Sequence, residues 1–133
     1  MSGSFVLGKD AEREDFDWGS FSWISKPATT AAGDLVVCHV TIEPGKGHDF
    51  HRHPDQEEVI HVIEGTMEQW LESERKVLGP GDSIFIGRDT VHASFNVSDV
   101  TLKVLAILGP CVGESGYELV DVSAEEPWAS MRS

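Results

Sequence analysis

The sequence has few basic residues, few cysteines and no long apolar run. Lysine and arginine together number 10, against 23 aspartates and glutamates, and the formal net charge is −13 at pH 7. Such a charge repels polyanions and argues against nucleic acid or an anionic membrane as a partner. No stretch reaches the roughly 20 apolar residues of a membrane span, and residues 1–15 lack the pattern of a secretion signal. We therefore expect a soluble, cytoplasmic protein.

The two cysteines are too few, and too far from any motif spacing, to form a disulfide scaffold or a thiolate metal site. Cys38 and Cys111 lie in or beside apolar stretches. Such cysteines are more often buried thiols than partners in a disulfide. Free thiols also fit a reducing compartment.

Long amphipathic helices are also missing, and short β-type runs separated by glycine, proline and aspartate take their place. Residues 35–42 and 101–108 are the clearest strand candidates. Successive side chains of a strand point to opposite faces, so every second side chain from Val36 to Ile42 and from Leu102 to Leu108 is expected to point inward. We expect strands at about residues 20–25, 35–42, 58–64, 66–71, 76–78, 83–86, 91–97, 101–108 and 117–122. This pattern predicts an all-β fold, either a barrel or a double-sheet jelly roll.

The chain length of 133 residues fits one domain with a real core. We expect the barrel at residues 35–122. Residues 1–34 form an N-terminal segment that packs on the barrel or on a partner subunit, and residues 123–133 form a C-terminal tail, with a helical turn around residues 124–131.

A pair of histidines two residues apart is the strongest chemical signal. On an extended backbone His51 and His53 point to the same side, so both imidazoles can reach one metal ion. Imidazole and carboxylate suit borderline divalent metals, and His92 on another strand is a candidate third ligand. His53 and Glu58 are an odd number of residues apart, so the Pro54-Asp55 segment must interrupt the strand if both are to bind.

These residues resemble two signature motifs of the cupin superfamily. The first runs Gly45-x5-His51-x-His53-x4-Glu58-x6-Gly65, and the second runs Gly81-x5-Gly87-x-Asp89-x2-His92-x3-Asn96. The second departs from the family pattern at two positions in the turn before His92. Gly87 replaces the usual proline, and Asp89 replaces the usual glycine. The resemblance covers residues 35–108 and implies a small, single-domain double-stranded β-helix (jelly-roll) barrel with one metal ion.

Similarity to cupins assigns His51, His53, Glu58 and His92 as the ligands of that ion. Glu57 is the alternative carboxylate, because the family allows three or four residues before the glutamate. The resemblance leaves iron, manganese, nickel, zinc and copper open. A six-coordinate ion on four protein ligands would keep two positions for water or substrate.

Other polar side chains near the motifs have weaker assignments. His48 is a candidate acid or base at the mouth of the site, but exposure in a glycine-rich loop is the favoured interpretation. Gln56, Ser94 and Asn96 are candidates to fix the imidazole tautomers, although a structural role is favoured for Asn96. His39 is expected on the solvent side of its strand.

Two function classes remain open. The first is a metal-dependent enzyme of the oxygenase or isomerase/lyase type, acting on a small organic molecule. The second is a non-catalytic module that binds a small molecule or a sugar. We also expect a homodimer, because an outward apolar face with Val59 and Ile63, together with the aromatic N-terminal segment, would otherwise stay exposed.

Overall fold

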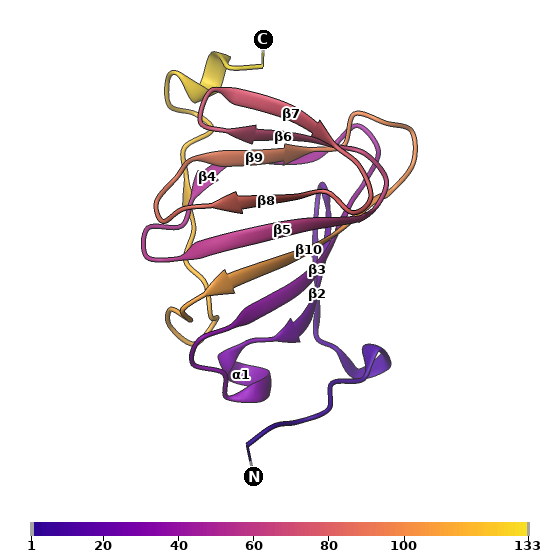
Figure 1. Ribbon diagram of the computed structural model, residues 1–133, viewed down its shortest axis with the longest axis vertical. Coiled ribbons are helices and arrows are strands. Elements are labelled where there is room, and N and C mark those ends of the chain that lie inside the picture. The colour runs from indigo at the N-terminus through magenta and orange to yellow at the C-terminus, as the bar shows by residue number, and fades with distance from the viewer. Residues whose placement is uncertain (1, 133) are drawn as a thin grey trace.

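The computed structural model describes residues 2–132 as two antiparallel sheets that face each other (Figure 1). The first sheet has six strands in the order β1 (Arg13–Phe16), β2 (Gly19–Ser25), β3 (Val36–Ile42), β10 (Leu102–Gly109), β5 (Glu57–Glu64) and β8 (Ser83–Ile86). The second has five strands in the order β11 (Val120–Asp121), β4 (Gly47–Arg52), β9 (His92–Phe95), β6 (Met67–Leu71) and β7 (Glu74–Leu78). The helical pieces are short: η1 (Gly8–Asp10), α1 (Pro27–Thr30) and η2 (Trp128–Ser130). The predicted all-β jelly-roll class is confirmed.

The core lies between the sheets and follows the predicted alternation. On β3 and β10 every second side chain is buried, in the order Val36, Cys38, Val40, Ile42 and Leu102, Val104, Ala106, Leu108. Their direct pairing aligns these two rows, for example Val104 with Val40. Each fully buried aliphatic side chain contributes about 1.5–3 kcal/mol, so the two central strands supply much of the stability.

The N-terminal segment extends the first sheet. Strand β2 pairs with β3, and Phe21 and Trp23 join the core beside Val40 and Cys38. Close strand contact requires Gly19, because a Cβ at that position would clash with the backbone oxygen of Thr41. The sequence predicted β2 but not β1. The domain boundaries proposed at residues 34 and 122 stay predictions.

The C-terminal tail covers the outer face of the second sheet, at the top of Figure 1. Trp128 stacks on Phe50 with ring centroids 5.6 Å apart. The Arg132 side chain lies 3.6 Å from the centre of the Phe95 ring and donates a 2.7 Å hydrogen bond to the buried carboxylate of Glu68. A second, smaller apolar cluster therefore forms on this face.

The outer face of the first sheet carries an apolar row across four strands. The register places Phe85, Val59, Ile107 and Val37 side by side. Phe85 is 59% exposed. Among residues 2–132, no helix has the length and apolar character needed to cross a membrane.

Candidate metal centre

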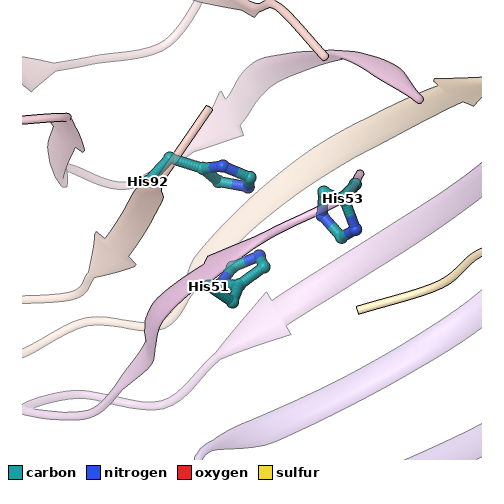
Figure 2. Close-up of side chains that lie close together, drawn as sticks. All are labelled: His51, His53 and His92. Atoms are coloured by element: carbon teal, nitrogen blue, oxygen red, sulfur yellow. The ribbon is translucent and has the colours of Figure 1, made fainter. Parts of the chain in front are cut away.

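Three buried histidines meet on the inner side of the second sheet. His51 lies on β4, His53 directly follows β4, and His92 begins β9. One ring nitrogen from each lies within 4.8 Å of the other two, and Figure 2 shows the three side chains gathered around a common space. The register pairs His51 with His92. Pairing of β4 with β9 therefore brings the two sequence motifs together.

Backbone carbonyls fix the orientation of all three imidazoles. The Nδ1 atoms of His51, His53 and His92 lie 2.6, 2.6 and 2.9 Å from the carbonyl oxygens of residues 49, 118 and 90, respectively. A carbonyl can only accept, so each Nδ1 carries a proton, and in the neutral ring Nε2 keeps its lone pair. This is the tautomer that a metal ion bound at Nε2 requires. The expectation that Gln56, Ser94 and Asn96 fix the tautomers is wrong, because backbone oxygens do so.

Glu58 completes the cluster with a carboxylate. Its Oε1 lies 3.3 Å from His53 Nε2 and 3.0 Å from His92 Nε2. Within residues 2–132, neither Glu58 Oε1 nor His92 Nε2 has a hydrogen bond of acceptable geometry. Lone pairs and a carboxylate oxygen that converge in a buried space favour a cation between them, either a proton or a metal ion. The residues present therefore fit a divalent metal ion.

The charges around Glu58 agree with a cation site. Burial alone would raise the pKa of Glu58, but His53 and His92 outweigh burial and lower it to about 2. Burial would likewise lower the pKa of His53, but Glu58 outweighs it and raises that pKa. Burial, assisted by the neighbouring histidines, lowers the pKa of His51 well below its usual value. A metal ion at His53 Nε2 would therefore compete with a proton that the Glu58 carboxylate stabilises there.

A four-residue turn lets His53 and Glu58 face the same interior. Strand β4 ends at Arg52 and β5 begins at Glu57. The turn between them is closed by a 3.3 Å hydrogen bond from the Gln56 amide to the His53 carbonyl. The predicted break in strand parity is confirmed. Glu57, the alternative carboxylate, is exposed and is not part of the cluster.

Gln56 ties this turn to residues 110–118. Its Nε2 donates to the carbonyls of Pro110 (2.8 Å) and Gly116 (2.9 Å), and its Oε1 accepts from the Glu118 amide (3.2 Å). The Gln56 side chain is 1% exposed. Since the Glu118 carbonyl holds His53, Gln56 acts on a candidate ligand through this segment. Sequence alone gave no signal for contacts across 60 residues.

His48 lies inside the site region and not in an exposed loop. It belongs to β4, and a register shift between His48 and His51 turns both rings to the interior. Its ring stacks on His51 (centroids 4.0 Å apart) and on Trp18 (4.8 Å). Burial lowers the pKa of His48 to about 4. The favoured interpretation of an exposed histidine is therefore wrong, and His48 stays a candidate catalytic residue.

The turn before His92 accommodates its unusual residues. Asp89 has a φ of 60°, the left-handed conformation that glycine adopts most easily. Its carboxylate accepts a 2.6 Å hydrogen bond from Arg52, and its amide donates to the His53 carbonyl at 3.0 Å. The turn is thereby tied to the strand that carries two histidines. Asn96 is structural, because its amide bonds the carbonyls of Ile42 and Val100.

A cavity of about 50 Å³ adjoins the histidines between the two sheets. A buried water needs about 10–15 Å³, so this space suits a metal ion with a few waters or a small ligand. Its lining is largely apolar and comes mainly from β2, β3, β5 and β10, together with Tyr117. The site thus combines a polar cluster with an apolar wall.

Fold and site together define a jelly-roll barrel with an internal candidate metal centre. A family model described as "Cupin domain" matches residues 38–108, more than half of the chain, and the chain belongs to this family. It is 30% identical over 103 residues to Protein SchB of Streptomyces halstedii, covering 77% of this chain and 75% of that protein.

Two further relatives extend the comparison. Polyketide synthase CurC of Streptomyces cyaneus is 27% identical over 106 residues, covering 80% of this chain and 69% of that protein. The solved structure of KdgF from Halomonas sp. superimposes with a TM-score of 0.73 at 21% identity, covering 84% of this chain and 96% of that one. The structural likeness supports the fold alone.

Proposed function

We propose that this protein is a metal-dependent enzyme that acts on a small organic molecule, with His51, His53, Glu58 and His92 as the ligands of one divalent ion. One observation carries the proposal. All three imidazoles donate Nδ1–H to backbone carbonyls, and the Nε2 atoms of His53 and His92 lie 3.3 and 3.0 Å from Glu58 Oε1. Such prior orientation of ligands is typical of metal sites.

The bound ion would supply a Lewis acid with a net charge near +1, because the carboxylate offsets one of its two charges and the three imidazoles are neutral. The chain's own residues supply the surroundings. The apolar wall lowers the polarity of the surroundings, which strengthens electrostatic interactions at the cluster. Backbone carbonyls keep the imidazoles from rotating, so the ligands need no rearrangement.

Enzyme activity is supported by the cavity beside the cluster, where a small molecule can contact the ion. The relative named as polyketide synthase CurC also points to small organic substrates. Oxygenase and isomerase/lyase chemistry both fit. The alternative is a non-catalytic module for a small molecule or a sugar. The apolar lining favours this alternative, because it offers few groups that could transfer protons. Besides the candidate ligands, these include His48, Tyr117 and Cys38.

Turnover separates the two classes. Protein loaded in turn with iron, manganese, nickel, zinc or copper should be incubated with small keto acids, catechols and uronates, and products followed by mass spectrometry. Turnover that disappears in the double variant His51→Ala, His92→Ala supports the enzyme. Saturable binding without product across the panel supports the binding module.

We also propose a homodimer formed through the outer face of the first sheet. Ile63 (46% exposed) and Phe85 (59% exposed) belong to its apolar surface. Sedimentation velocity at micromolar concentration should give a dimer, and a monomer would contradict the proposal. Val59→Glu should yield monomers, whereas Val77→Glu on β7 of the other sheet should not.

The cytoplasm is the proposed compartment. Its support is that Cys38 and Cys111 are both free thiols, which fits a reducing environment.

A further inference from the structure

We infer that the preferred ligand is a planar, largely apolar molecule that presents one weakly acidic hydroxyl next to a carbonyl, and not a dianionic acid or a sugar acid. This inference rests on the proposed function, because the hydroxyl and carbonyl oxygens would reach the ion. It goes further by naming the substrate class from the walls of the cavity.

Aromatic rings form a continuous wall that starts at a candidate ligand. The Tyr117 ring lies 6.4 Å from His53 and 5.6 Å from Trp23, and Trp23 meets Phe21 edge to face at 5.5 Å. All of these side chains line the cavity. A wall of rings favours flat apolar molecules, which gain both burial and ring contacts.

Beside the rings, on the same sheet, the lining is aliphatic. Val40, Ile60 and Val104 come from three neighbouring strands and are 7%, 5% and 3% exposed. The Ser94 hydroxyl lines the same cavity, but it already donates a 2.6 Å hydrogen bond to Gln69. A sugar would leave several hydroxyl groups facing this surface without partners, at a cost for each.

The described lining of the cavity has no permanently charged cation to balance a second negative charge. Among residues 2–132, no lysine or arginine belongs to its lining. Two nearby cations bind carboxylates elsewhere: Lys26 pairs with Glu12 at 2.5 Å, and Arg52 pairs with Asp89 at 2.6 Å. The loaded site carries a charge near +1, which one deprotonated hydroxyl neutralises. A dianion would leave an unpaired charge in an apolar space.

The test compares two chelators that each offer two oxygens, tropolone and oxalate. Their affinities for the zinc-loaded protein, from isothermal titration calorimetry, are divided by their affinities for free zinc in the same buffer. The corrected ratio is the corrected affinity for tropolone divided by that for oxalate. It should be about ten or more, because only tropolone buries an apolar ring. A corrected ratio at or below one overturns the inference.

A charge placed in the cavity provides a matched test. Tyr117→Lys should shift the ratio toward oxalate by about tenfold, through loss of a ring and gain of a cation. Leu119→Lys adds the same charge in the same segment but outside the lining, and should leave the ratio unchanged. Equal shifts in both variants overturn the inference. If Tyr117→Lys does not fold, the wild-type ratio decides.

Zinc content of the same samples separates the two proposals. Wild-type protein that retains neither zinc nor any of the other four metals overturns the proposed function, and the inference falls with it. Protein that retains zinc but binds oxalate as well as tropolone, after correction, overturns the substrate class alone.

Discussion

Replacement of Gln56 by leucine should weaken both the barrel and the candidate metal site. Gln56 makes three hydrogen bonds that join the turn after β4 to residues 110–118. Leucine fills a similar volume but cannot donate or accept. The carbonyl of Gly116 and the amide of Glu118 would lose their partner, and the segment that holds His53 would loosen.

The expected loss of stability follows from these three bonds. Only the bond to Gly116 is fully buried, and the other two are partly buried. A buried group left without a partner costs about 1–3 kcal/mol and a partly exposed one less, which gives a total of about 2–4 kcal/mol. For a chain of this length the Tm should fall by roughly 8–16 °C. Urea denaturation of the metal-free protein measures the free energy directly.

Metal affinity distinguishes positioning from general destabilisation. Groups that orient ligands typically change affinity by about 10–100-fold, and we expect the lower end because Gln56 acts through the Glu118 carbonyl. The matched control is Gln69→Leu, since Gln69 is 2% exposed and hydrogen-bonded to Ser94 but touches no group that holds an imidazole. The reasoning is refuted if both variants lose similar stability and bind zinc as tightly as wild type.

Three further predictions concern His48, Asp89 and Trp128. The pKa of His48 is lowered to about 4 from 6.5. As the pH falls, His48 therefore takes up a proton in the unfolded chain before it does so in the folded protein. The stability contributed by neutral His48 is present above pH 6.5 and is lost as the pH falls toward 4. Metal-free His48→Phe should lose less stability than wild type over this range in urea titrations, and equal pH dependence would contradict this. Asp89→Gly should lower the free energy of unfolding by no more than the surface ion pair with Arg52 contributes, about 0–1 kcal/mol. Asp89→Ala should lower it by about 1 kcal/mol more, because alanine is strained at the positive φ of this position. Equal Tm values for the two variants would count against the strain argument. Trp128→Ala should lower stability by about 1–3 kcal/mol by uncovering Phe50 without changing zinc affinity, and an unchanged unfolding midpoint would show that the tail contributes little.

Regular alternation made the central strands predictable from the sequence. The patterns at residues 35–42 and 101–108 arise because only one side of each strand meets the core. The structure confirms both, with every second residue of β3 and β10 buried. The short β1 was not predicted, because its residues Arg13–Phe16 are mostly charged and exposed. It forms by pairing with β2, which is a tertiary effect.

The site was predictable where it depended on spacing within a motif. The spacing required a break between His53 and Glu58, and the turn provides it. The irregularity within β4 had no such signal, so His48 was placed in an exposed loop. The backbone carbonyls that hold the imidazoles were also hidden, since one of them, that of Glu118, lies 65 residues from His53.

The central claim is that His51, His53, Glu58 and His92 hold one divalent metal ion. It is tested most directly by metal content, measured by mass spectrometry on protein purified without added metal. Wild-type protein should carry close to one ion per chain, and the double variant His51→Ala, His92→Ala should carry almost none while keeping its β-sheet circular dichroism. Equal metal in the two proteins would contradict the claim.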